Sequence, residues 1–319
     1  MNIEMKKPKI ILMGTSSFAL PSFREVLDSH EFEIVAIFTQ PDKKAGRGKI
    51  MTQTAVKEMI LREYSDIPIY QPEKFKAPEN IALIKKLKPD LIFVVSYGHI
   101  LPKEVLAIPK FGCVNLHASV LPLLRGSSPI VYAILNGFKT TGVTFFKLTP
   151  KVDDGDVIFS EEIPIYYNAT QDVLTEELAF LGGSLAVDVL SRYLSGELTP
   201  KPQDHSQATF TKMIEKEHGK IDFAKIDALD IERMTRAYFP WPGVYTFYND
   251  KRLKLINVKV SNEEPSLEAG SVFLTAKQEV AISTKEGSIV INTLQIEGKR
   301  VMEAKEFIRG YGDFVGSTL

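Results

Sequence analysis

The sequence is poor in cysteine and tryptophan and has no excess of charge of either sign. Its 319 residues include one cysteine and one tryptophan. A single cysteine cannot form an intramolecular disulfide or a CxxC metal or redox pair, so we expect a reducing compartment, the cytoplasm. The 39 Lys and Arg residues balance 40 Asp and Glu residues, for a formal net charge of -1. This balance excludes electrostatic binding of nucleic acid over the whole protein surface.

Long apolar runs are missing as well. The basic N-terminal stretch leads into an apolar run of only about five residues before Gly14, too short for a secretory or membrane-spanning segment. We therefore expect neither secretion nor membrane insertion. The composition is otherwise that of a globular protein, with 44% hydrophobic and 25% charged residues. The length predicts one large or two medium domains.

In the first half of the chain, short apolar runs alternate with amphipathic stretches. This alternation is typical of parallel strands joined by crossover helices, so we predict a doubly wound, mostly parallel α/β sheet of Rossmann-like type. The predicted strands cover residues 9–14, 33–40, 90–96, 112–117 and 141–148, and the predicted helices cover residues 18–30, 53–65 and 79–88.

The pattern changes after residue 170. Residues 170–196 predict one long helix, in which Gly182-Gly183 favours a bend or break. Residues 197–207 have the prolyl, polar composition of a linker. We therefore assign an N-terminal domain to residues 1–196 and a C-terminal domain to residues 208–319.

The C-terminal domain carries short β-like runs after a predicted helix at residues 228–238. Five such runs within about 60 residues predict a small antiparallel, OB-like barrel, a fold that often contacts nucleic acid. The runs are residues 244–248, 253–260, 270–274, 280–284 and 289–296.

Two polar residues close a predicted buried strand. Asn115 and His117 are two positions apart and share a face, so they project together near the carboxyl end of the strand, where open α/β sheets bind ligands. An amide donor and a titratable base are thereby brought together. Taken alone, the pair fits a buried, hydrogen-bonded histidine better than a catalytic site.

An acidic turn follows the next predicted strand and should lie at the same sheet edge. It contains Asp153, Asp154 and Asp156, whose plainer interpretation is a solvated or self-capped turn. The twelve-residue calcium loop and its flanking helices are missing. The sequence also has no HxxxH or cysteine cluster, so we expect no metal. GxGxxG and GxxxxGK[ST] motifs are absent too, which disfavours dinucleotides and nucleoside triphosphates.

One local cluster is strongly basic. Four cationic residues share seven positions with two glycines, directly after predicted strand 33–40. Such a run is usually a solvated connection. Its place at the ligand-bearing edge also suits a phosphate partner. The cationic residues are Lys43, Lys44, Arg47 and Lys49.

Several strings, in the right order, resemble the methionyl-tRNA formyltransferase family over nearly the whole chain. Val120, Leu124 and Asp154 depart from the family's usual residues but leave the proposed catalytic side chains in place. The strings are QPDKKAGRGK (40–49), PDLIFVVSYGHILP (89–102), FGCVNLHASVLPLLRGSSP (111–129), TGVT leading to DDGD (141–156), PWPG (240–243) and QIEGKR (295–300).

The resemblance implies a reaction and its residues. The formyl group of 10-formyltetrahydrofolate would pass to the α-amino group of methionyl initiator tRNA, giving N-formylmethionyl-tRNA for translation initiation. The enzyme would act as a cytoplasmic monomer, away from membranes and without a metal. The implied catalytic residues are Asn115, His117 and Asp153; the folate-binding residues are Ser119, Val120, Leu121 and Pro122; the tRNA-binding residues are Lys43, Lys44, Arg47, Lys49, Lys299 and Arg300.

The catalytic trio meets two chemical needs of such a transfer, and the order of proton transfers stays open. Asn115 and a protonated His117 suit the stabilisation of an oxyanion, and His117 paired with Asp153 suits proton removal. Two other function classes also remain. A hydrolase or an amino-sugar formyltransferase that uses the same folate needs the same trio. A tRNA-binding module without catalysis is the remoter class, because the trio is intact.

Overall fold

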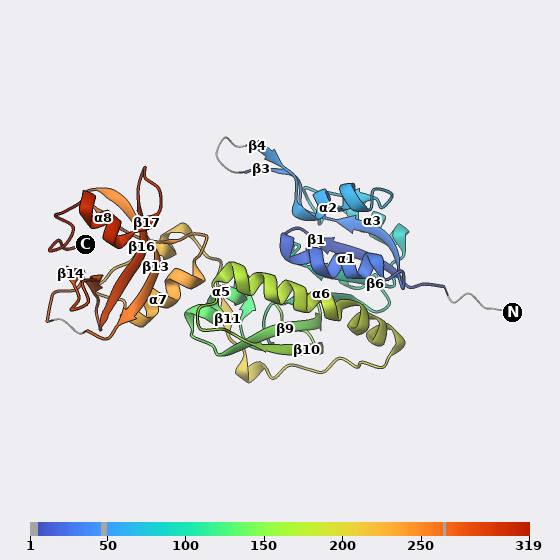
Figure 1. Cartoon of the computed structure of the whole chain (residues 1–319). Helices are drawn as coiled ribbons and strands as arrows, with labels where there is room; N and C mark the ends of the chain where they lie inside the picture. Colours follow the sequence, from blue (N-terminus) through green and yellow to red (C-terminus); the bar gives the residue numbers. More distant parts are fainter. Residues whose placement is uncertain (1–5, 46–49, 264–265) are drawn as a thin grey trace. The chain divides into compact units, whose positions relative to one another are not determined.

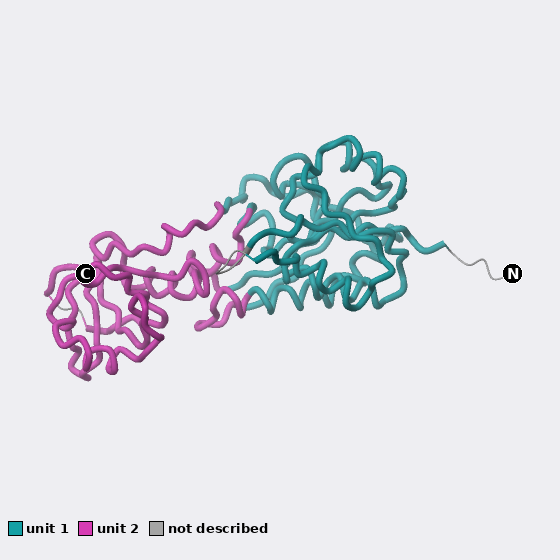
Figure 2. Tube along the Cα trace, turned by 90° about the horizontal axis from the view of Figure 1, so that it is seen from above, with its two compact units in different colours: residues 1–126, 140–164, 175–211 teal, residues 127–139, 165–174, 212–319 magenta. Residues whose placement is uncertain are grey.

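The computed structural model describes residues 6–45, 50–263 and 266–319. Contacts divide the chain into two compact units, coloured separately in Figure 2. The first unit comprises residues 1–126, 140–164 and 175–211, and the second comprises residues 127–139, 165–174 and 212–319. Within the described ranges, no helix has the length and apolar character needed to cross a membrane.

The first unit is built on a seven-stranded sheet with the order β10-β9-β7-β6-β1-β2-β5 (Figure 1). The strands from β7 to β5 are parallel, which confirms the predicted doubly wound sheet. Residues 141–148 were also expected to run parallel, but β9 is antiparallel to both β7 and β10. The strands are β1 (Lys9–Gly14), β2 (Glu33–Phe38), β5 (Ile69–Tyr70), β6 (Leu91–Val95), β7 (Cys113–His117), β9 (Thr140–Lys147) and β10 (Val157–Pro164).

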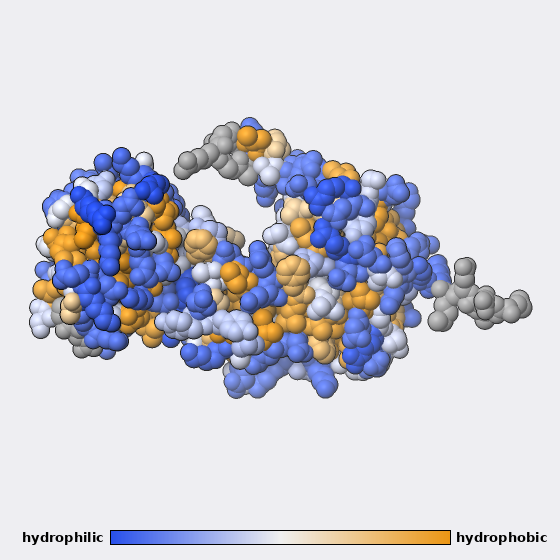
Figure 3. All heavy atoms as spheres, in the orientation of Figure 1, coloured by the Kyte–Doolittle hydropathy of each residue, from blue (hydrophilic) through white to orange (hydrophobic). Residues whose placement is uncertain are grey.

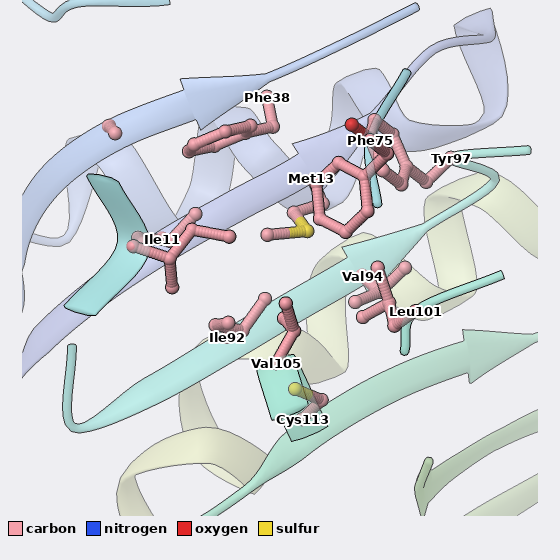
Figure 4. Close-up of a cluster of buried hydrophobic side chains, with 12 residues drawn as sticks. Ile11, Met13, Phe38, Phe75, Ile92, Val94, Tyr97, Leu101, Val105 and Cys113 are labelled. Atoms are coloured by element: carbon pink, nitrogen blue, oxygen red, sulfur yellow. The ribbon is translucent and has the colours of Figure 1, made fainter. Parts of the chain in front are cut away.

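Helices pack against both faces of this sheet because side chains alternate along each strand. On one face, Ile11 and Met13 of β1 share a core cluster with Ile84 and Val105 from two helices (Figure 4). On the other face, the Phe23 ring lies 6.1 Å from the Phe93 ring. The helices of the sheet are η1 (Ser17–Ala19), α1 (Leu20–Asp28), α2 (Ala55–Glu63), α3 (Pro78–Leu87), α4 (Lys103–Leu106) and α6 (Gln171–Ser195).

Helix α6 passes through Gly182-Gly183 as one continuous element, as the long helical pattern predicts, and the glycines do not break it. A Cβ atom on Gly182 would lie 2.5 Å from Leu116 Cδ2 of β7, and one on Gly183 would lie 2.9 Å from Pro21 Cβ of α1. The two glycines therefore serve close packing of α6 on the sheet and on α1 rather than flexibility.

The strand order indicates at which point along the sheet a ligand would bind. The chain builds β1, β2 and β5 in one direction and then crosses to β6 and β7 on the other side of β1. Open α/β sheets bind ligands where the order reverses, outside the carboxyl ends of the strands. Here that point lies between β1 and β6, and β7 is the next strand along.

The second unit contains an antiparallel sheet with the path β12-β13-β16-β15-β14, and β17 pairs with β16. The path matches the five predicted β runs, and α7 packs against β13 and α5. The elements are α5 (Pro129–Leu135), η3 (Lys216–Gly219), α7 (Ala228–Ala237), β12 (Val244–Tyr248), β13 (Lys251–Ser261), β14 (Val272–Leu274), β15 (Val280–Ser283), β16 (Ser288–Ile296), β17 (Met302–Glu303) and α8 (Ala304–Gly310).

The single cysteine gives a test of this packing. Cys113 is 1% exposed in the core cluster, and burial raises the pKa of its thiol to about 12. At pH 8 the group is therefore a protonated thiol that reagents cannot reach. We expect the native protein to leave 5,5′-dithiobis(2-nitrobenzoate) unreacted, and the guanidinium-unfolded protein to release one equivalent of thionitrobenzoate. Equal reaction rates in the two states would contradict the burial of Cys113.

Candidate active site

Asn115 and His117 lie on β7, an interior strand with β6 on one side and β9 on the other. Because they are two positions apart, both side chains leave the same face of the sheet. Asn115 is half-buried, whereas His117 is buried. The amide donor and the imidazole predicted from the sequence are therefore neighbours.

The imidazole of His117 is held from several sides. Its Nε2 atom lies 3.0 Å from the carbonyl oxygen of Leu124, and its ring meets the Phe146 ring edge-on. A carbonyl oxygen can only accept, so in the neutral ring Nε2 carries the hydrogen and Nδ1 keeps the lone pair. Nδ1 lies 3.8 Å from Asp153 Oδ2. The basic nitrogen of His117 therefore faces a carboxylate.

Asp153 reaches His117 by a different route from the one expected. We expected the carboxyl end of strand 141–148 to deliver Asp153 to the same sheet edge. Instead β9 is antiparallel to β7: Thr144 pairs with His117, and Lys147 pairs with Val114 at the far end of the strand. The chain after Lys147 must fold back, and the Gly126 amide donates to Asp153 Oδ2 at 2.7 Å where it arrives.

The returning turn lies against β9 at Gly155. A Cβ atom on Gly155 would lie 1.8 Å from the Lys147 carbonyl oxygen, so no other residue permits this approach. Asp153 itself has a φ of +49°, an uncommon backbone conformation for a residue with a side chain. The turn is therefore shaped by close backbone contact.

The other two carboxylates of the turn do not face His117. Asp154 accepts a hydrogen bond from Thr149 and lies 3.8 Å from Lys151 Nζ, whereas Asp156 is exposed. Throughout the part of the chain that the structure describes, no three His, Cys, Asp or Glu side chains are arranged to hold a metal ion.

The segment from Ser119 to Pro122 follows directly after His117 and is tied to β9. The Thr144 hydroxyl donates to the Ser119 carbonyl oxygen at 2.7 Å and accepts from the Leu121 amide at 3.1 Å. Ser119 Oγ donates to the Leu123 carbonyl oxygen at 2.6 Å. Val120 and Pro122 are half-buried, so the segment presents apolar surface on a fixed backbone.

Sequence reasoning missed two buried residues beside the trio. Arg125 and Gln203 are 4% and 7% exposed, and the Arg125 guanidinium donates to Gln203 Oε1. Gln203 lies in the segment interpreted as a linker. The sequence signal for Arg125 was its place in the family-like string of residues 111–129. The polar composition around Gln203 gave no sign that this side chain is buried.

The predicted tRNA-binding residues are distant from the trio in sequence, and those that the structure describes are exposed. Lys43 and Lys44 are exposed on a hairpin of β3 (Lys43–Ala45) and β4 (Ile50–Thr52), which also carries hydrophobic atoms (Figure 3). Arg47 and Lys49 lie outside the described residues. Lys299 and Arg300 are exposed in the second unit, and Arg300 pairs with Glu306.

The arrangement as a whole can perform acid–base chemistry at a carbonyl group. An amide donor, a base with its lone pair at Nδ1 and a carboxylate beside that base converge on β7, and apolar surface follows in the next segment. Such a set can stabilise a developing oxyanion and remove a proton from a nucleophile.

Comparisons with known proteins identify the family of the chain. Residues 7–190 match the family described as formyl transferase, and residues 213–312 match the formyl transferase C-terminal domain. A methionyl-tRNA formyltransferase of Clostridium novyi is 39% identical over 98% of this chain and 99% of its own length. One of Roseiflexus castenholzii is 41% identical over 95% of this chain and 96% of its own length.

A solved structure with a similar fold is an N-formyltransferase from Helicobacter canadensis in complex with folinic acid and dTDP-3-aminofucose. It has a TM-score of 0.63 at 21% identity, over 89% of this chain and 98% of that chain. This likeness concerns the fold alone. The sequence relatives decide the family, and the predicted resemblance is confirmed: the chain belongs to the methionyl-tRNA formyltransferases.

Proposed function

We propose that this protein transfers the formyl group of 10-formyltetrahydrofolate to the α-amino group of methionyl initiator tRNA. The observation that carries the proposal is the approach of Asp153 Oδ2 to His117 Nδ1, at 3.8 Å, beside Asn115. It occurs in a chain 39–41% identical, over almost its whole length, to methionyl-tRNA formyltransferases. The product, N-formylmethionyl-tRNA, serves translation initiation.

Each residue of the trio has a role in this proposal. Bound 10-formyltetrahydrofolate supplies the formyl group as an activated formamide. The Asn115 side-chain amide donates to the formyl oxygen as negative charge develops there. His117 Nδ1 takes the proton of the attacking amine, because Nε2 is engaged with the Leu124 carbonyl oxygen. The Asp153 carboxylate stabilises the imidazolium that results, and the imidazolium returns the proton to the folate nitrogen as the bond from that nitrogen to the formyl carbon breaks.

We propose that Ser119, Val120, Leu121 and Pro122 bind the folate. A flat pterin needs apolar walls and backbone hydrogen-bonding groups. This segment offers both, because Thr144 fixes its backbone at two points while Val120 and Pro122 stay half-buried. Its position directly after His117 suits a donor whose formyl group must reach the trio.

We propose that the basic hairpin binds the acceptor end of the tRNA, through Lys43, Lys44, Arg47 and Lys49. Its base is firmly anchored: Asp42 accepts hydrogen bonds from Lys57 at 2.6 Å and from Gln71 at 2.7 Å. These bonds hold the pKa of the Asp42 carboxyl below its usual value. An anchored base with exposed lysines suits contact with a phosphate backbone.

The C-terminal domain, residues 208–319, is proposed to hold the rest of the tRNA, while residues 1–196 carry catalysis. Arg252 Cζ lies 4.2 Å from the Tyr245 ring centroid, and Lys254 pairs across the strands with Tyr245. Cationic groups beside aromatic rings on a β-sheet are typical of OB-fold domains that bind single-stranded nucleic acid. Lys299 and Arg300 would add contacts to phosphate. We further propose that the protein acts as a monomer in the cytoplasm.

The choice of acceptor tests the proposal. The purified protein is incubated with 10-formyltetrahydrofolate and methionyl initiator tRNA, a dTDP-amino sugar or no acceptor. We expect formylation of the charged tRNA only, because the hairpin and the C-terminal domain carry cationic groups suited to RNA. Formylation of the sugar, or release of formate without an acceptor, would assign the protein to one of the other two enzyme classes.

Loss of any trio residue should slow the chemical step. We expect Asn115→Ala, His117→Ala and Asp153→Ala each to lower kcat by more than tenfold, since removing one oxyanion donor typically costs about 10²-fold. Asp156→Ala is the matched control, because Asp156 belongs to the same turn but is exposed. Its kcat should stay near wild type. Circular dichroism verifies folding, and wild-type kcat in any trio variant would remove that residue from the mechanism.

Arg47 is expected to contribute most among the four basic residues, because a guanidinium can engage phosphate or a base edge with two donors at once. Arg47→Ala should lower formylation of charged initiator tRNA at least tenfold, while folate affinity, measured by fluorescence, stays near wild type. The matched control is Arg62→Ala, which removes a 63% exposed arginine from α2. If Arg47→Ala formylates at the wild-type rate, the tRNA contacts lie elsewhere.

A further inference from the structure

The segment Lys201–Thr211, here called the strap, runs beside both parts of the proposed active site. At its start, Lys201 and Val157 exchange two backbone hydrogen bonds of 2.8 Å, next to the Asp153 turn. At its end, β11 (Phe210–Thr211) pairs in parallel with β8 (Arg125–Gly126). The short helix η2 (His205–Gln207) lies between the two ends. The strap therefore connects the acidic turn with the segment that contacts it.

Gln203 is the side chain through which the strap holds the Asp153 turn. Its Nε2 donates to the Asp153 carbonyl oxygen at 2.9 Å and to the Gly155 carbonyl oxygen at 2.7 Å. Both amide hydrogens are thus used on the two sides of the turn. The side chain is buried, so water does not compete for these bonds.

Arg125 sets the orientation of the Gln203 amide. Its Nη2 and Nε donate to Gln203 Oε1 at 2.7 and 3.2 Å, and Nη2 also lies 2.9 Å from His205 Nδ1. A guanidinium has donors only, so it accepts no hydrogen bond from an amide nitrogen. Reversing the Gln203 amide would therefore place donor against donor at Arg125 and oxygen against oxygen at the turn.

Asp153 is consequently held at both ends. Gln203 bonds its carbonyl oxygen, and the amide of Gly126, the residue after Arg125, bonds its carboxylate. The turn includes a left-handed residue, which other contacts must maintain. We infer that Gln203, oriented by Arg125, is a positioning residue that sets the distance of Asp153 from His117 Nδ1. This inference rests on the catalytic role proposed for Asp153.

The first test compares two glutamines of the strap. Gln203→Ala should lower kcat at least tenfold, because small displacements of a catalytic group cost one to two orders of magnitude, about 10²-fold for 1 Å. KM for the folate and for the charged tRNA should stay within about twofold, since neither substrate is bound by Gln203. Gln207→Ala, an exposed position of the same segment, should behave as wild type. Wild-type kcat in Gln203→Ala would overturn the inference.

Gln203→Glu separates positioning from stability. A glutamate at position 203 still accepts hydrogen bonds from Arg125, now within an ion pair. It has no amide hydrogens to donate to the Asp153 and Gly155 carbonyl oxygens. The second carboxylate oxygen faces the two carbonyl oxygens of the turn, so we expect kcat to fall at least as far as in Gln203→Ala, measured at a temperature below the melting transition of both variants. Wild-type kcat in Gln203→Glu would show that the two donated bonds are dispensable and would overturn the inference.

A double-mutant cycle with Asp153→Asn distinguishes this inference from the proposed function. If Gln203 acts through Asp153, Gln203→Ala should lower kcat much less in the Asp153→Asn background than in wild type. Equal losses in both backgrounds would refute the positioning role while leaving the catalytic role of Asp153 in place. Wild-type kcat in Asp153→Asn alone would refute the catalytic role, and the positioning role with it.

Discussion

The hydrogen bond from the Gly126 amide to Asp153 Oδ2, 2.7 Å long, is the contact on which the site depends. Strand β9 runs away from His117, so its carboxyl end lies beside the start of β7. The chain after β9 must therefore turn back along the sheet, and the Gly126 amide then donates a hydrogen bond to the Asp153 carboxylate. Gly155 makes this return possible because its missing side chain leaves room for the Lys147 carbonyl oxygen. Without the return, His117 would lack a carboxylate beside Nδ1.

Much of the first unit could be predicted because buried parallel strands are continuous apolar runs. The runs at β1, β6 and β7 are of this kind, and the period of two placed Asn115 and His117 on one face. The direction of β9 could not be predicted, because an apolar strand pattern is the same for both directions. The folate and tRNA residues came from the family resemblance and remain proposals.

The strap shows why polar segments are difficult to interpret from sequence. Its prolines and hydrophilic residues are those of a solvated linker, yet Gln203 is buried and uses its amide oxygen and nitrogen together. Such a role depends on partners far away in sequence, here Arg125 and Asp153. No local pattern encodes them, so only the three-dimensional structure identifies the segment as part of the first unit.

The strap also affects where the chain can be cut when one part is produced alone or joined to another protein. A division at residue 196 would follow the change in composition, but it would leave β8 without β11 and the Asp153 turn without Gln203. The first unit, as its contacts define it, extends to Thr211. A different C-terminal module joined after Thr211 would preserve these contacts, but it would separate residues 127–139 and 165–174 from the rest of the second unit.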